Sequence, residues 1–143
     1  QGNPLAFEFA KPTVPDLNYS FSGLKTSVLY FLQKQAPDFI ENNKADLCAS
    51  VQYTIVTILL KKLKKAMQTT GIKEICIAGG VSANSGLRKG IQALGDKMQA
   101  KVYLPQFQYC TDNAAMIAIA AHYKYLAGAF DSLETTASAR SNW

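Results

Sequence analysis

The second half of the sequence alternates between short β-type runs and helical periods. The apolar, β-branched run at 75–78 predicts a strand covered on both faces, and 101–104 predicts a second strand. Between them we expect a helix that Ser82 caps, with an apolar stripe of Leu87, Ile91, Leu94 and Met98. A further helix is expected at about 112–127. This order predicts an α/β fold with a βαβα unit and a right-handed crossover.

The first half predicts helices after an irregular start. Residues 1–22 are rich in Pro, Asn and Phe and lack a helical period, so they predict an irregular lead-in from a missing N-terminal part. Residues 23–71 predict a helical segment, with helices over about 24–37 and 46–70. The longer helix has an apolar stripe of Val51, Ile55, Ile58, Leu59, Leu63 and Met67. Residues 72–143 are the predicted α/β nucleotide-binding subdomain and C-terminal tail.

Length and composition limit the class of protein. A chain of 143 residues with 48% hydrophobic residues suits one globular domain. Charges interrupt the apolar runs well short of the roughly 18 residues of a membrane span, so no membrane association is expected. The start lacks Met, a basic n-region and an apolar h-region, and we expect a fragment without a signal peptide. Three widely spaced cysteines argue against disulfides and a structural zinc site and favour a reducing cytoplasm.

The net charge of +5 would suit a polyanionic partner such as RNA. Much of that charge comes from one run, KKLKK at 61–65. Such a run is usually the solvated face of a helix. Charge alone therefore leaves both RNA binding and a plain helix surface open.

The segment between the first predicted strand and its helix favours anion binding. Gly79 and Gly80 let a ligand approach the backbone closely, and the following helix points free N–H groups and a partial positive charge into the same space. Asn84 adds an amide that both donates and accepts hydrogen bonds, as recognition of a ribose or base edge requires. The alternative is a tight βα turn with an N-cap and no ligand, and the spacing alone does not decide between them.

Asp112 follows the second strand and its loop, and it could present a carboxylate to a metal at the same edge of the sheet. Alternatively, Thr111 or Asp112 simply caps the next helix. One carboxylate is too few for a metal site, and His122 lies about 15 Å further along the same helix at 1.5 Å per residue. We therefore expect any further ligands outside this chain and read His122 as a surface or packing residue. No complete catalytic set is visible.

Three motifs together resemble a known family. The stretches YSFSGLKTSV at 19–28, AGGVSANSGLR at 78–88 and CTDNAAMIAIA at 110–120 are similar, in order and spacing, to successive signatures of the TsaD family. The ending ARSNW at 139–143 also fits. The resemblance covers nearly the whole chain. It implies the C-terminal lobe of an actin-like, Hsp70-like ATPase (ribonuclease H-like) fold, with a helical segment before the βαβα unit.

The resemblance also implies an activity. Family members are tRNA N6-adenosine threonylcarbamoyltransferases, once called O-sialoglycoprotein endopeptidase or glycoprotease. They move a threonylcarbamoyl group from threonylcarbamoyl-AMP to N6 of the adenosine 3′ of the anticodon, in tRNAs reading codons that begin with A. The implied partners are tRNA, a paralogous actin-like subunit and a small ATPase subunit of the bacterial complex. We expect a cytoplasmic enzyme, and a fragment that is inactive alone.

The implied site residues follow the motifs. Asn84 matches a nucleotide-contacting asparagine, and Gly79 and Gly80 match the glycine loop beside the phosphates of threonylcarbamoyl-AMP or ATP/ADP. Asp112 matches an aspartate that ligates one iron or zinc ion, whose other ligands are a histidine pair in the N-terminal lobe. Lys25 lies in a family motif without an assigned role. Ala114 replaces a common glycine, a change that a helix favours by about 1 kcal/mol.

Two other classes compete with this interpretation. A non-catalytic actin-like paralogue could use the same fold as a scaffold for partner subunits, but it need not keep Asp112. Another enzyme of the superfamily, such as a sugar kinase or Hsp70-like ATPase, shares a Gly-Gly loop but not CTDNAAMIA. The glycoprotease label is weakest, because no protease machinery is visible in the sequence.

Overall fold

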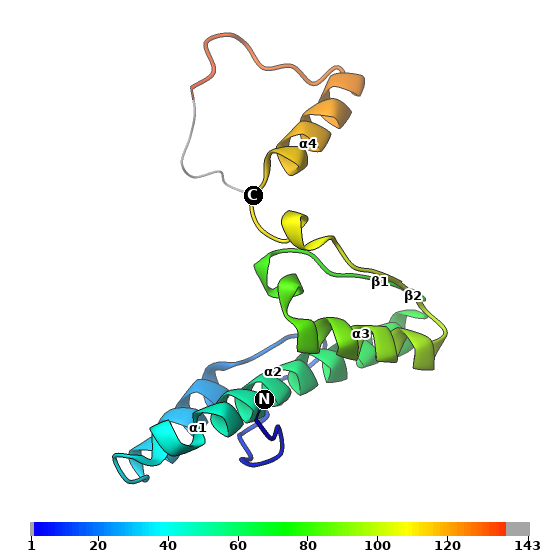
Figure 1. Cartoon of the computed structure of the whole chain (residues 1–143). Coiled ribbons are helices and arrows are strands. Elements are labelled where there is room, and N and C mark those ends of the chain that lie inside the picture. Colours follow the sequence, from blue (N-terminus) through cyan, green and yellow to red (C-terminus); the bar gives the residue numbers. More distant parts are fainter. Residues whose placement is uncertain (1, 137–143) are drawn as a thin grey trace.

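The computed structural model describes residues 2–136. Figure 1 shows two packed helices at one end, a crossover helix and a small sheet in the middle, and a last helix that stands apart. The elements in chain order are α1 (Ser22–Gln33), α2 (Phe39–Thr70), β1 (Glu74–Cys76), the 3-10 turn η1 (Gly80–Ala83), α3 (Ser85–Met98), β2 (Lys101–Tyr103), η2 (Phe107–Tyr109) and α4 (Ala114–Leu126). The predicted ending at 139–143 lies outside the described residues, and the division at 22 and 71 stays a prediction.

α2 begins at Phe39, so the predicted start at about residue 46 is wrong. Phe39 packs edge-on against Phe7 and Phe31, with ring centroids 5.6 and 5.9 Å apart. Asn42, Asn43 and Asp46 have low helix propensity and favoured a later start in the sequence, but tertiary packing of the aromatic rings outweighs that preference. The irregular N-terminal stretch is part of this core, since Phe9 is only 3% exposed.

The predicted apolar stripe of α2 is confirmed, and it serves two separate cores. Toward the N-terminal half, Ile58 is buried with Leu24 of α1 and Phe9, and Val51 and Ile55 pack against them. Toward the C-terminal half, a second core joins α2, α3 and the two strands, with Met67, Ile75, Leu87, Ile91 and Leu94 as its buried members. The 32-residue helix therefore connects the helical segment to the βαβ unit. Gly71 ends it at φ 72°.

β1 and β2 pair in parallel, with Ile75 opposite Val102, as the predicted βαβ unit requires. α3 covers one face of this pair, and its Gly95 lies so close to Val102 that a Cβ would overlap it. The prediction that the first strand is covered on both faces is wrong within residues 2–136. Ile75 is buried, but Glu74 and Cys76 on the opposite side are exposed, because no described element packs there.

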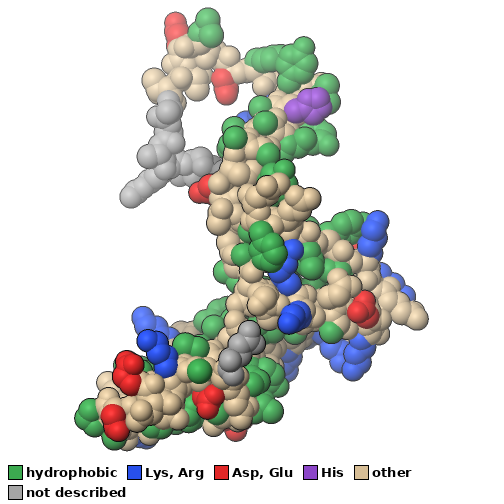
Figure 2. Space-filling view, viewed as in Figure 1, with side chains coloured by type: hydrophobic (Ala, Val, Ile, Leu, Met, Phe, Trp, Pro, Cys, Tyr) green, Lys and Arg blue, Asp and Glu red, His purple; other side chains and the backbone are tan. Residues whose placement is uncertain are grey.

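α4 is an apolar helix without a core. Its bounds lie within two residues of the predicted 112–127, and Gly128 follows at φ 67°. None of its residues is buried, and Figure 2 shows apolar side chains gathered around it. The large exposed hydrophobic side chains here are Met116, Ile117, Ile119, Tyr123, Tyr125 and Leu126. Within the described residues, no helix is both long enough and apolar enough to cross a membrane.

Candidate functional site

Two loops meet at the carboxyl edge of the small sheet. Because β1 and β2 run in parallel, the loop after each strand leaves from the same edge. A further bond, from Ile77 N–H to the Tyr103 carbonyl at 3.4 Å, continues the pairing to the point where the loops begin. The first loop carries the glycine pair and Asn84, and the second leads to Asp112. The structure thus brings both predicted segments to one edge of the sheet.

The local backbone requires glycine at only one of the two positions. Gly79 has φ 78°, a left-handed conformation that strains any residue with a side chain. Gly80 does not have a positive φ, and a Cβ added there would meet no atom within 4 Å. The local backbone therefore explains Gly79, whereas nothing among the described residues requires glycine at position 80. The space beside both glycines is open, as close approach of a ligand to the backbone would need.

Asn84, not Ser82, caps α3, so the predicted cap is wrong. The 3-10 turn η1 is inserted after the glycines and delays the helix until Ser85. Asn84 Oδ1 accepts from Leu87 N–H at 2.9 Å, and Asn84 Nδ2 donates to Gln52 Oε1 on α2 at 3.0 Å. Ser82 is instead 1% exposed, and its Oγ has no hydrogen-bond partner in the described part of the chain. Asn84 keeps one lone pair and one amide hydrogen for a ligand.

Asp112 does not cap a helix either, and neither does Thr111, so that alternative is wrong. Asn113 is the cap of α4, with its Oδ1 accepting from Met116 N–H at 3.1 Å. Asp112 is exposed. Residues 2–136 contain no group of three His, Cys, Asp or Glu side chains able to hold a metal. His122 is exposed, as expected for a surface residue.

Arg88, on α3, joins the two loops and was missed from the sequence. Its Nη1 donates to the Ser82 carbonyl at 2.9 Å, and its Nη2 donates to the Pro105 carbonyl at 2.7 Å. The guanidinium carbon lies 4.5 Å from the centroid of the Phe107 ring. The buried thiol of Cys110 accepts a longer contact from Nη1, at 3.9 Å. Its acceptors are backbone carbonyls of two loops, and a sequence pattern carries no signal for them.

An apolar groove opens beside Asn84. It holds about 500 Å³, within the range of pockets that bind small molecules. Val81 and Asn84 come from the glycine loop, and the remaining lining side chains come from α2: Leu47, Cys48, Val51, Gln52, Ile55 and Val56. This groove is large enough for a nucleoside, and it contacts a predicted site residue.

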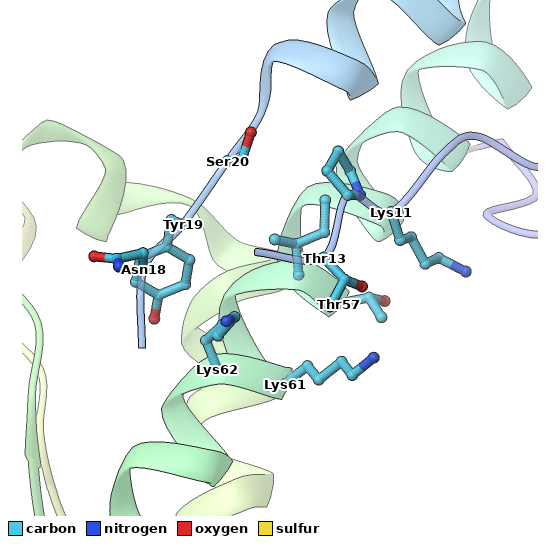
Figure 3. A pocket seen from close by; sticks show the side chains of 10 residues that line it. Lys11, Thr13, Asn18, Tyr19, Ser20, Thr57, Lys61 and Lys62 are labelled. Carbon is cyan, nitrogen blue, oxygen red and sulfur yellow. The ribbon is translucent and has the colours of Figure 1, made fainter. Parts of the chain in front are cut away.

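A second cavity lies between the N-terminal loop and α2 (Figure 3). At about 60 Å³ it has room for a few water molecules but not for a nucleotide. Lys62 Nζ donates there to the carbonyls of Val14 and Asp16 at 2.6 and 2.7 Å. Partial burial raises the pKa of the Tyr19 hydroxyl, which donates to the Leu59 carbonyl at 3.4 Å. Part of the lysine run thus ties the N-terminal loop to α2.

Comparisons with known proteins agree with the motifs. The family model described as TsaD, tRNA N6-adenosine threonylcarbamoyltransferase, matches residues 1–119. Proteins of that name from Christiangramia forsetii and Riemerella anatipestifer are 52% and 55% identical over 143 and 142 residues, which are 98% and 97% of this chain. The one from Cytophaga hutchinsonii is 53% identical over 133 residues, or 91% of the chain and 39% of the relative. The chain spans about 42% of the length of the first two. The chain therefore belongs to the TsaD family.

Proposed function

We propose that this chain is the C-terminal lobe of a tRNA N6-adenosine threonylcarbamoyltransferase with an actin-like, Hsp70-like ATPase fold. The intact enzyme transfers the threonylcarbamoyl group of threonylcarbamoyl-AMP to N6 of the adenosine 3′ of the anticodon. In that step the N6 nitrogen bonds to the carbamoyl carbon, AMP leaves, and the nitrogen loses a proton. Support comes from the family match and from the name of the relatives.

We assign the nucleotide end of the site to Gly79, Gly80 and Asn84. The observation that carries this assignment is Gly80, which has open space around it and no conformational reason of its own to be glycine. A phosphate beside the two glycines would meet backbone N–H groups at the start of η1 and α3. The adjoining groove of about 500 Å³ suits a purine, and Asn84 retains hydrogen-bonding capacity at its rim.

The carboxylate of Asp112 is chemically suited to bind a metal ion, but one carboxylate does not make a complete site. The Asp112 carboxylate is exposed at the shared edge of the sheet, and no described group of side chains completes a site. We infer that Asp112 is one ligand of an iron or zinc ion whose histidine ligands lie in the rest of the enzyme. Such an ion would supply Lewis-acid chemistry at the acyl group. The part of Asp112 is to provide one oxygen ligand and negative charge.

The further expectations follow from the same proposal. We expect the intact enzyme in the cytoplasm, with tRNA as substrate and with a paralogous actin-like subunit and a small ATPase subunit as partners. The exposed apolar surface of α4 is consistent with a lobe that is completed by other protein surface. The 143-residue chain alone should be inactive, because among residues 2–136 no group of side chains completes a metal site, and no complete catalytic set is visible in the sequence.

Reconstitution tests the proposal. The intact protein, supplied with threonylcarbamoyl-AMP, tRNA and the partner subunits, should form the modified nucleoside, measured by mass spectrometry of digested tRNA. The 143-residue chain in the same mixture is the control and should form none. A folded intact protein that binds tRNA but yields no modified nucleoside would refute the assigned reaction.

A further inference from the structure

The Arg88 side chain donates hydrogen bonds to backbone carbonyls of both loops of the site. Its two Nη atoms reach the Ser82 carbonyl in the glycine loop and the Pro105 carbonyl at the start of the second loop, at 2.9 and 2.7 Å. We propose that Arg88 is a positioning residue that sets the separation between the glycine loop and the segment leading to Asp112. The role of that separation in the reaction rests on the proposed function, whereas the mechanical link between the loops does not.

The link depends on the shape of the guanidinium as well as on its charge. A planar fork presents two N–H donors in fixed directions, so one side chain can hold two carbonyls from different loops at a set spacing. The Phe107 ring lies under the guanidinium, with 4.5 Å between the guanidinium carbon and the ring centroid. This stacking limits rotation of the fork. A lysine ammonium keeps the charge but has neither the plane nor the fork.

Arg88 supplies the side-chain hydrogen bonds between the two loops in the described part of the chain. Their 3-10 turns are internally bonded, through Ser82 N–H to the Gly79 carbonyl at 2.9 Å and Cys110 N–H to the Phe107 carbonyl at 3.2 Å. Each turn is therefore a local unit, and the described side-chain hydrogen bonds between the two units come from Arg88. Groups that must act together lose rate when displaced by as little as 1 Å. Arg88 is thus placed to align the nucleotide end with Asp112.

Hydrogen exchange of the intact protein tests the link. Arg88→Lys should speed exchange of the η1 and η2 amides at least about tenfold, because each bond to a charged donor is worth enough to account for that factor. Exchange in α2 and in the core of α3 should not change. Lys89→Ala is the matched control, since Lys89 is the exposed neighbour on α3, and it should leave both loops unchanged.

Coupling between the loops gives a readout that general destabilisation would not move. With ADP as the probe, the unsubstituted protein should gain protection at Ser82 and Asn84 and also at Tyr109 and Cys110. In Arg88→Lys, ADP should protect the first loop only. Phe107→Leu keeps the Arg88 guanidinium but removes the aromatic ring beneath it, so it should cause a smaller loss of the same coupling. This variant replaces Arg88→Lys in the test if that protein yields too little folded material.

The outcomes separate this proposal from the proposed function. Unchanged exchange and unchanged coupling in Arg88→Lys would overturn the positioning role, because charge alone would then suffice. Faster exchange throughout α2 as well as the loops would also overturn it, since the role would be general stability. If ADP protects no amide in the unsubstituted protein, the nucleotide assignment fails, and the exchange without ADP still decides whether Arg88 links the loops.

Discussion

Replacing Asn84 by alanine removes both the acceptor that caps α3 and the donor that reaches Gln52. The lost cap should cost about 1 kcal/mol of unfolding free energy, and the lost bond, at 3.0 Å on an exposed surface, about 0.5–1 kcal/mol. Asn84→Asp keeps an oxygen for Leu87 N–H and adds favourable charge at the helix start, so its stability should stay within about 0.5 kcal/mol of the unsubstituted protein. Gln52 can turn its amide to donate to the new carboxylate.

Nucleotide binding should separate the variants differently from stability. Asn84→Asp should keep its stability but lose ADP affinity, because a carboxylate at this position repels phosphate and has no amide donor. ADP affinity, measured by calorimetry on the intact protein, should fall at least about tenfold in both variants, a loss of about 1.4 kcal/mol or more. Unfolding in urea gives the stability arm. Ser85→Ala is the matched control, since Ser85 is exposed at the next position, and it should change neither quantity. Full ADP affinity in Asn84→Asp would refute the binding role, and an unchanged urea midpoint in Asn84→Ala would refute the capping argument.

Three other results are expected. Asp112→Ala in the intact protein should abolish stoichiometric metal, as measured by elemental analysis of the purified protein, and a full complement of metal would contradict its assignment. Gly95→Ala places a methyl group against Val102 and should lower the unfolding free energy by about 1–2 kcal/mol, after the gain in helix propensity is counted. Adding Val102→Ala should recover part of this loss, and strictly additive losses in the double variant would contradict the overlap. Cys110, at 1% exposure, should react with thiol reagents far more slowly in the native protein than in urea; equal rates would show that it is not buried.

The sequence predicted the parts of the fold that depend on local patterns. The stripes of α2 and α3 and the parallel pairing of the two strands follow from hydrophobic period and alternation, and the structure confirms them. The position of the glycine loop at the edge of the sheet followed from the alternation of strands and helices along the chain. Asn84 and Asp112 were singled out from their places after the two strands, and the specific roles that the family resemblance implies for them stay predictions.

The remaining features depend on contacts between distant residues. The start of α2 was predicted too late because Phe39 is held by rings from two other segments. The cap of α3 was misplaced because Ser and Asn are both good caps, and only the inserted η1 turn selects Asn84. Arg88 was missed because its acceptors are carbonyls, at Ser82 and Pro105, and a sequence pattern carries no signal for backbone acceptors.

The absence of buried side chains on α4 has a consequence for any ligand of Asp112. A helix of 13 residues with no buried side chain is marginal in water, and Asp112 stands just before its first turn. Under the metal assignment proposed above, the arrangement of Asp112 that binds the ion would be populated for only part of the time until other protein surface covers α4, and the apparent affinity would fall by that fraction. By thermodynamic reciprocity, covering α4 raises the affinity of Asp112 for its ligand by some factor, and the bound ligand raises the affinity of α4 for the covering surface by the same factor. Occupancy of Asp112 and assembly of the complete enzyme would thus be two halves of one linked equilibrium.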